Sequence, residues 1–346
     1  MALSSTIPCQ VIDNIKFPQR LFNAFEGVEN TVALEILQIL IFPGVFFLLV
    51  LSFFYEWIDR KIYAKIQSRY GPLTAGPAGI FQPIADFLKL LSKEDIVPAI
   101  CDRLLFTASP IIYLTLPLTA LFVVPIASNS SIAAFEGDLV FVMFILALMI
   151  ITVFLGGWSS RNRYSTIGGV RAMLQMMSFE IPLALALSGP AIAAKSLSIS
   201  TISQWQSSAT WLVLLQPIGF VVLVICLMAE METAPFNIPE SESEVVAGWR
   251  TEFSGKKLAL IRLGKNLELV LASALIAALY LGGIQDLFFI PAVVVFLIKT
   301  ILVVFLISFL RAIFARLRLD QSIAGMWKYL LPLAILQNIL VELGIG

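Results

Sequence analysis

Eight long apolar stretches constrain this sequence more than any other feature. A helix needs roughly 20 mostly apolar residues to cross a bilayer. Eight stretches reach that length: 34–57, 104–127, 138–156, 173–194, 211–231, 266–284, 287–310 and 325–343. Lipid offers no partner for backbone N–H and C=O groups, so each span is expected to be helical, and Pro43, Pro117, Pro182 and Pro332 predict kinks. The pattern predicts an all-α integral membrane protein, a single polytopic domain over 1–346 with eight transmembrane helices.

The composition excludes several classes of protein. Hydrophobic residues make up 59% and charged residues 13%, against roughly 45–50% and 25% in soluble domains, so a water-soluble enzyme is excluded. The formal net charge is zero, and no nucleic-acid partner is expected. There is no histidine, and Cys9, Cys101 and Cys226 form no C-x-x-C pair, so no metal site is expected. Without a P-loop or G-x-G-x-x-G motif, the chain is expected to bind no cofactor of its own.

Basic residues are distributed unevenly between the two sides of the predicted spans. The segments 58–103, 157–171, 232–265 and 311–328 hold 19 of the 23 Lys and Arg residues. The opposite side holds only Lys16, Arg20 and Lys195. Because cytoplasmic loops carry an excess of Lys and Arg, the four basic segments are expected to face the cytoplasm or matrix. Both termini are then expected outside.

Two segments carry the pattern of amphipathic helices that lie on a membrane surface. After Pro83, apolar residues recur at three- and four-residue spacing over 84–91, with charged residues on the other face. The preceding residues 71–79 are rich in Gly and Pro and predict a loop. Phe17, Leu21, Phe22 and Phe25 follow the same helical spacing. The alternative for the 84–91 segment is a solvated connector.

The third basic segment contains an unusual acidic run, AEMETAPFNIPESESEVVAGWRTEFSGKK, at 229–257. Its carboxylates are Glu230, Glu232, Glu240, Glu242, Glu244 and Glu252, which inverts the charge bias of a cytoplasmic loop. Glu240 and Glu244 are four residues apart, so on a helix they would share a face. Like charges that close raise at least one pKa and can store or relay a proton. The alternative is an acidic loop that meets a basic partner.

Two carboxylates are predicted at membrane depth, because Glu180 interrupts the fourth span and Glu230 ends the fifth. A charge at the bilayer centre costs roughly 2.5–3.5 kcal/mol on insertion scales, and such residues mark ion or proton pathways. The alternative for Glu180 is a single structural salt bridge, with Arg171 as the candidate partner. The residues alone indicate a proton or ion path, or a membrane anchor for a redox partner.

Four motifs, in the same order, resemble those of the H-type membrane subunit of complex I (NADH-quinone oxidoreductase) and its relatives in other respiratory complexes. The first charged segment holds DRKIYAKIQSRYGP and AGPAGIFQPIADFLKLLSKE, and the second holds GGWSSRNRYSTIGGVRAMLQMMSFEIPLALAL. The third holds AEMETAPFNIPESESEVVAGWRTEFSG, and the last holds LRAIFARLRLDQ. The similarity runs from Tyr55 to Leu340, nearly the whole chain.

The resemblance implies a role and a set of partners. In this family the subunit docks a peripheral arm of iron–sulfur subunits and forms the membrane side of a chamber where electrons reach quinone. It also begins a chain of buried carboxylates that leads, beside small membrane subunits, toward antiporter-like pumping subunits. The resemblance therefore implies an oxidoreductase and translocase subunit in the cell membrane or an inner organellar membrane. Quinone would lie at the interface with the arm, and the iron–sulfur clusters in partner subunits.

The resemblance also assigns residues by position. The chamber entry and the docking region would contain Asp59, Arg60, Lys61 and Arg69. The chamber loop and the start of the proton path would contain Glu230, Glu240, Glu242, Glu244 and Glu252, with Glu180 continuing the path into the membrane. The basic residues near the path would be Arg171, Arg316, Arg318 and Lys265.

The chain departs from the family pattern where relatives often carry Glu in the sixth helix, since it has Lys265. A positive charge there would alter the proton path and the wall of the quinone tunnel. One alternative is therefore the same coupling role in a quinone-free, ferredoxin-linked hydrogenase or sulfur-reducing complex. Two other classes stay open: a stand-alone secondary transporter that uses Glu180 and Glu230, and an anchor whose carboxylates carry no protons.

Overall fold

The computed structural model describes residues 37–128, 130–208, 210–285 and 291–344. Within these ranges it is helical and contains no strand. The longer helices are α3 (Val45–Ile66), α4 (Gln82–Ser92), α5 (Arg103–Val123), α6 (Asp138–Ser159), α7 (Arg163–Ala194), α8 (Ile199–Ser208), α10 (Pro217–Glu230), α12 (Gly255–Tyr280), α13 (Ala292–Ile313) and α15 (Leu331–Glu342). The shorter ones are η1 (Pro77–Gly79), α9 (Leu212–Leu215), α11 (Glu242–Val245), η2 (Gly248–Arg250), α14 (Leu319–Gly325) and the π-helix η3 (Met326–Leu330). The helix predicted around Phe17 lies outside the described residues.

The fold class predicted from hydropathy is confirmed. Seven described helical segments are long and apolar enough to cross a membrane: Leu37–Ile66, α5, α6, α7, α12, α13 and the continuous segment Leu319–Glu342. The predicted fifth span corresponds to α10, an apolar helix of only 14 residues. The amphipathic segment after Pro83 is also a helix, α4, and it packs against α3 and α12.

The fourth and fifth spans differ from their predicted bounds. Helix α7 begins at Arg163 rather than near 173, because the Asn162 side chain caps it by accepting a hydrogen bond from the Tyr164 N–H at 3.0 Å. The helix runs through Pro182 for 32 residues in all. The fifth span is broken at Gln216, because the residue before a proline, here Pro217, is disfavoured in the helical conformation.

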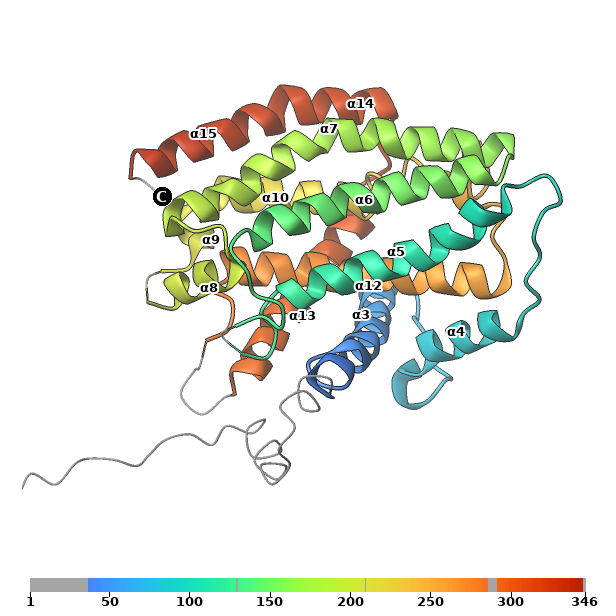
Figure 1. Cartoon of the computed structure of the whole chain (residues 1–346), viewed down its shortest axis with the longest axis horizontal. Helices are drawn as coiled ribbons and strands as arrows, with labels where there is room; N and C mark the ends of the chain where they lie inside the picture. The colour runs from blue at the N-terminus through green and yellow to red at the C-terminus, as the bar shows by residue number, and fades with distance from the viewer. Residues whose placement is uncertain (1–36, 129, 209, 286–290, 345–346) are drawn as a thin grey trace, which may run out of the picture.

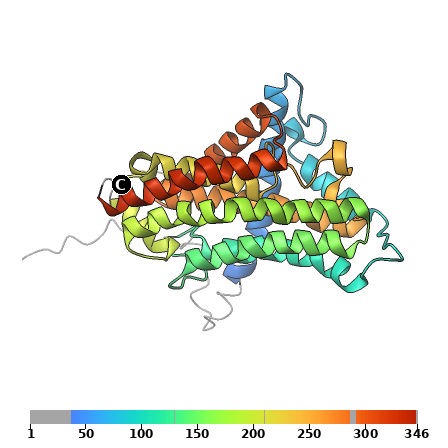
Figure 2. The ribbon, with the colours of Figure 1, turned by 90° about the horizontal axis from the view of Figure 1, so that it is seen from above.

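Helix α12 lies at the centre of the bundle, where every residue from Val270 to Tyr280 is buried. Several of these residues are Ala or Ser, and small side chains let neighbouring helices approach closely. The axes of helices α5, α6, α7 and α15 are roughly aligned, whereas those of α3 and α13 cross them obliquely (Figure 1). Figure 2 shows α3 crossing the bundle from the perpendicular view.

Glycine pairs at the end of α6 and the start of α7 make room for the acidic segment. Trp249, 2% exposed, lies against both helices. A Cβ atom at Gly168 would be 2.6 Å from the Trp249 backbone N, and one at Gly157 would be 3.2 Å from the Trp249 Cβ. The Gly-rich sequence at 156–169 therefore has a packing function, which fixes the acidic segment over the ends of these two helices.

Candidate functional site

The four basic segments meet at one end of the bundle. Lys257 Nζ is 2.5 Å from Asp95 Oδ2, which joins the third segment to the first. Glu244 of the third segment pairs with Arg171 of the second and with Arg316 of the fourth, the latter at 3.0 Å. The structure thus places these segments together, as an arrangement on one side of the membrane requires. Which side they face stays a prediction.

A cluster of two carboxylates and two cations lies at the centre of this end. Glu240 Oε2 is 3.0 Å from Lys265 Nζ and also pairs with Arg250. Glu232 Oε2 is 4.0 Å from the same Lys265 Nζ and accepts a hydrogen bond from Trp249 Nε1 at 3.4 Å. Both carboxylates are buried. We call Glu232, Glu240, Arg250 and Lys265 the loop cluster.

The two carboxyl groups of the loop cluster differ in proton affinity. Burial and the neighbouring Glu240 carboxylate raise the pKa of Glu232 to about 7, against the opposing effect of Lys265 and Arg250. Burial acts on Glu240 as well, but Lys265 and Arg250 outweigh it and hold the pKa of Glu240 below its usual range. Near neutral pH, Glu240 is therefore charged while Glu232 exchanges a proton.

Two further buried carboxylates continue from the loop cluster into the bundle. Glu268, one turn beyond Lys265 on α12, is 3% exposed and accepts a hydrogen bond from the Tyr113 hydroxyl of α5 at 2.9 Å. Glu230, at the end of α10, is also 3% exposed, and its Oε1 has no hydrogen-bond partner among the described residues. The charges of Glu268, Glu232 and Glu180 all act on Glu230. These carboxylates therefore lie within electrostatic reach of one another.

The predicted pairing of Glu240 with Glu244 on one helix face is wrong. Helix α11 begins only at Glu242, so Glu240 precedes it and contacts Lys265 and Arg250 instead. Glu244 points to Arg171 and Arg316, whose hydrogen bonds and charges hold the pKa of Glu244 below its usual range. The coupled partner of Glu240 is Glu232, which lies in the turn after α10.

A second polar group joins α3, α4 and α12. Arg60 pairs with Glu56 one turn earlier on α3, and its Nη1 is 2.6 Å from Asp86 Oδ2 of α4. Asn266 of α12 donates a hydrogen bond to Glu56. Burial opposes ionisation of Asp86, but hydrogen bonds from Arg60 and Gln82 and the charges of Arg60 and Arg262 together outweigh it and lower the pKa of Asp86. These four residues, which we call the entry group, hold the amphipathic helix α4 against the bundle.

The remaining residues predicted by position are more dispersed. Asp59 accepts hydrogen bonds from Ser308 at 2.7 Å and Arg311 at 2.6 Å, both on α13. Lys61 is half-buried, and exposed Arg69 stacks on the Tyr63 ring at 5.6 Å. Glu252 accepts a hydrogen bond from Asn162. Glu242 and Arg318 are exposed, with no ion pair among the residues that the structure describes.

Arg171, the candidate partner of Glu180, does not pair with it. Arg171 pairs with Glu244, near the start of α7. Glu180 lies more than two turns further along α7, is half-buried, and has no ion pair within the described ranges. Its charge acts on Glu230, which links Glu180 electrostatically to the inner carboxylates.

The resemblance assigned no role to several residues that the structure brings into these groups, although Glu232 belongs to the acidic run. Glu56 and Asp86 belong to the entry group, while Glu232 and Glu268 belong to the carboxylate run. Glu56 lies four residues before Arg60, a spacing that places the two side chains together on a helix. That spacing is visible in the sequence, whereas the contact between Arg60 and Asp86 depends on how α4 folds back.

The donors of the loop cluster face its carboxylates. Lys265 and Arg250 pair with Glu240, and Trp249 Nε1 donates to Glu232. Over the described ranges, the His, Cys, Asp and Glu side chains also form no group of three or more that could hold a metal ion.

The match to a known family covers the whole of this arrangement. The family model for NADH dehydrogenase matches residues 37–342. That range includes nearly all of the eight predicted spans, together with the loop cluster, the inner carboxylates and the entry group. The chain belongs to the NADH dehydrogenase family, which is the family of the H-type membrane subunit of complex I.

Proposed function

We propose that this chain couples redox chemistry in a docked peripheral arm to ion movement through the membrane. Its family makes it a multi-pass membrane subunit of an oxidoreductase complex with several subunits. In the proposal, the gathered basic segments dock the iron–sulfur subunits, and the carboxylates pass charge inward toward antiporter-like pumping subunits. The observation that carries the proposal is the run of buried carboxylates Glu240, Glu232, Glu268 and Glu230.

The proposed mechanism is electrostatic. Lys265 is shared by Glu240 and Glu232, at 3.0 Å and 4.0 Å. Unit charges about 4 Å apart interact by about 4 kcal/mol at an effective dielectric constant of about 20. In the proposal, an electron arriving in the docked arm disturbs this balance of charges, and Glu232, whose pKa is about 7, responds at neutral pH. Glu268 and Glu230 receive that change because their own ionisation depends on the charge of Glu232.

A second candidate differs only in the electron acceptor, and Lys265 favours it. A relative with Glu at this position would lack the ammonium group that here neutralises Glu240. In this chain Lys265, Arg250 and Trp249 each contact a carboxylate, Glu240 or Glu232. We therefore propose the same coupling role in a complex whose acceptor is a proton or a sulfur compound, with a quinone-reducing complex as the alternative.

Substitutions of the inner carboxylates test the coupling role. We expect Glu268→Gln and Glu230→Gln to leave most electron transfer intact in the purified complex while reducing ion uptake into proteoliposomes at least tenfold, for protons or for sodium. Glu136→Gln is the matched control, because Glu136 is exposed and lies outside the carboxylate run. Unchanged ion uptake in both variants would mean that the chain is an anchor. Ion transport by the chain without iron–sulfur subunits would show a stand-alone transporter.

The acceptor is tested separately on the intact complex with reduced ferredoxin as donor. We expect turnover with protons or polysulfide and none with an added short-chain quinone. Quinone reduction that is blocked by an inhibitor of the tunnel would instead show that the chamber retains its quinone despite Lys265. In that case the coupling role stands and only the acceptor changes.

A further inference from the structure

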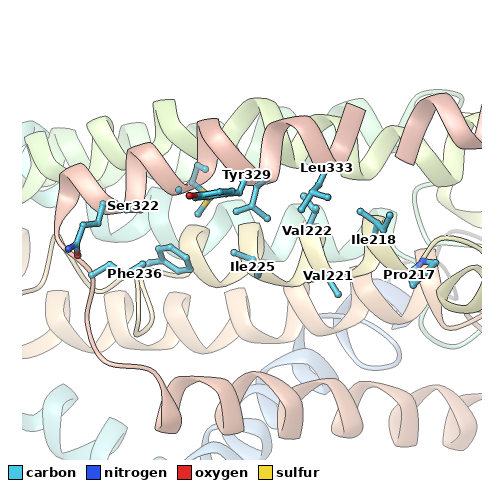
Figure 3. Close-up of a pocket in the computed structure, with 14 residues that line it drawn as sticks. Pro217, Ile218, Val221, Val222, Ile225, Phe236, Ser322, Tyr329 and Leu333 are labelled. Carbon is cyan, nitrogen blue, oxygen red and sulfur yellow. The ribbon is translucent and has the colours of Figure 1, made fainter. Parts of the chain in front are cut away.

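An apolar groove of about 580 Å³ lies between α10 and the segment formed by α14, η3 and α15. Its walls are almost wholly aliphatic, with Ile218, Val222 and Ile225 on one side and Leu333 on the other (Figure 3). Phe236 lies at one end, in the loop after α10. The volume falls in the range of small-ligand sites, roughly 300–1,000 Å³.

The groove follows from the shortness of α10. Its 14 residues span about 21 Å at 1.5 Å per residue, well short of the roughly 30 Å hydrocarbon core. On the facing segment, Gly325 lines the groove, and a Cβ placed there would meet nothing within 4 Å. The backbone conformation of Gly325 is ordinary α-helix, so the glycine leaves space rather than relieving strain.

One end of the groove is polar. The Ser322 hydroxyl lines it, the residue is 1% exposed, and the oxygen has no hydrogen-bond partner among the described residues. A buried polar group without a partner is costly. The Tyr329 hydroxyl points toward this same end (Figure 3). An amphiphile with its polar atoms at Ser322 and its chain along the groove would supply a hydrogen-bond partner for the hydroxyl and apolar contacts for the walls.

A positive charge lies beside the polar end. The Arg318 backbone C=O accepts a hydrogen bond from the Ser322 N–H at 2.9 Å. The Arg318 side chain is exposed and has no ion pair within the described ranges. An uncompensated cation at this end favours an anionic headgroup.

The length of the groove matches one leaflet. From Ser322 to Leu333 the lining segment rises about 16 Å at roughly 1.5 Å per residue, and half of a 30 Å hydrocarbon core is about 15 Å. We propose that this groove binds one acyl chain of an anionic phospholipid, with the ester and phosphate oxygens at Ser322 and Arg318. The lipid completes the part of the bundle that the short α10 leaves open.

A lipid fits the groove better than a helix of a partner subunit. A transmembrane helix would need contact over the full hydrocarbon thickness, roughly 30 Å, and helix interfaces in membranes are enriched in small residues. The groove is half that long, and of its lining residues only Gly325 and Ser322 are small.

The test measures phospholipid retained by the purified intact complex, by native mass spectrometry after exchange into vesicles of phosphatidylglycerol or phosphatidylcholine. We expect Gly325→Trp, which fills the groove, to lose one bound phospholipid relative to wild type. Leu302→Trp is the matched control, because Leu302 of α13 is 59% exposed and does not line the groove. Ser322→Ala removes only a hydroxyl and is the second test variant if Gly325→Trp fails to assemble. We expect it to retain several-fold less lipid than wild type.

The headgroup is tested with Arg318→Gln. We expect the preference of the variant complex for phosphatidylglycerol over phosphatidylcholine to be about fivefold lower than that of wild type, which corresponds to about 1 kcal/mol for one surface cation. Equal lipid retention in wild type, Gly325→Trp and Ser322→Ala would overturn the proposal. A photo-crosslinker at Tyr329 that captures a protein subunit and no lipid would also overturn it.

Discussion

Replacing Lys265 with methionine is expected to raise the pKa of Glu232 from about 7 to above 8. Lys265 is among the groups that oppose the effect of burial on Glu232, and methionine keeps a similar unbranched length without the charge. Loss of the positive charge favours the protonated, neutral carboxyl group. Glu232 in the variant should therefore stay protonated through pH 7, where the wild-type group is about half ionised.

The magnitude follows from the distance. Two unit charges 4 Å apart interact by about 4 kcal/mol at an effective dielectric constant of about 20, or about three pKa units. Lys265 Nζ is 4.0 Å from Glu232 Oε2, but its side chain is 22% exposed, so solvent screens part of this interaction. Arg250 also remains in place. A rise of between about one and two pKa units is therefore the expected result.

The assay is an infrared titration of the protonated carboxyl C=O band in the purified complex. The band of Glu232 is identified by its loss in Glu232→Gln. Lys256→Met is the matched control, because Lys256 is exposed on the same helix. If the Glu232 band titrates at the same pH in Lys265→Met as in Lys256→Met, the shared ion pair does not set the proton affinity of Glu232. The electrostatic mechanism then fails.

Three further changes test other contacts in the site. Tyr113→Phe removes the hydroxyl that donates to Glu268 at 2.9 Å but keeps the ring packed against Trp249, so ion uptake into proteoliposomes should fall several-fold while electron transfer continues. Asp95→Asn leaves the buried Lys257 without its charge partner. Because Asp95 is 31% exposed, we expect the free energy of unfolding to fall by about 1–2 kcal/mol. The measurement is the thermal unfolding midpoint, with Glu94→Gln as control. Gly168→Ala would place a Cβ 2.6 Å from the Trp249 backbone, so protease should cleave the 232–254 segment faster than in Gly325→Ala, where the added methyl group meets open space.

The spans could be predicted from the sequence because the cost of placing a residue in lipid is a local property. Each of the predicted spans corresponds to a described helix, and the break at Pro43 follows from its missing backbone donor. The amphipathic helix α4 could be predicted for a similar reason, since helical spacing alone decides which side chains share a face. The start of α7 could not, because Gly168 and Gly169 mimic a loop while packing against neighbouring segments.

The pairing of charges could not be predicted, because it depends on how distant segments fold together. Glu240 contacts Lys265, 25 residues later, and Glu244 contacts Arg171, 73 residues earlier. The four-residue spacing of Glu240 and Glu244 predicts a shared face only if both residues are helical, and Glu240 is not. Residue type did indicate which carboxylates are costly to bury, and Glu230 and Glu240 are both buried.

Charged side chains in this chain are neutralised by partners on other segments. This arrangement is relevant to the proposed coupling of redox chemistry to ion movement. Lys265 of α12 neutralises Glu240 and approaches Glu232, while Tyr113 of α5 holds Glu268 one turn deeper. When Glu232 gains a proton, Lys265 is left wholly to Glu240, and the negative charge acting on Glu230 and Glu268 falls. When Glu232 loses the proton, both effects reverse. In the proposed mechanism, the order in which the inner carboxylates are protonated thus changes through side-chain charge alone, with every helix in place.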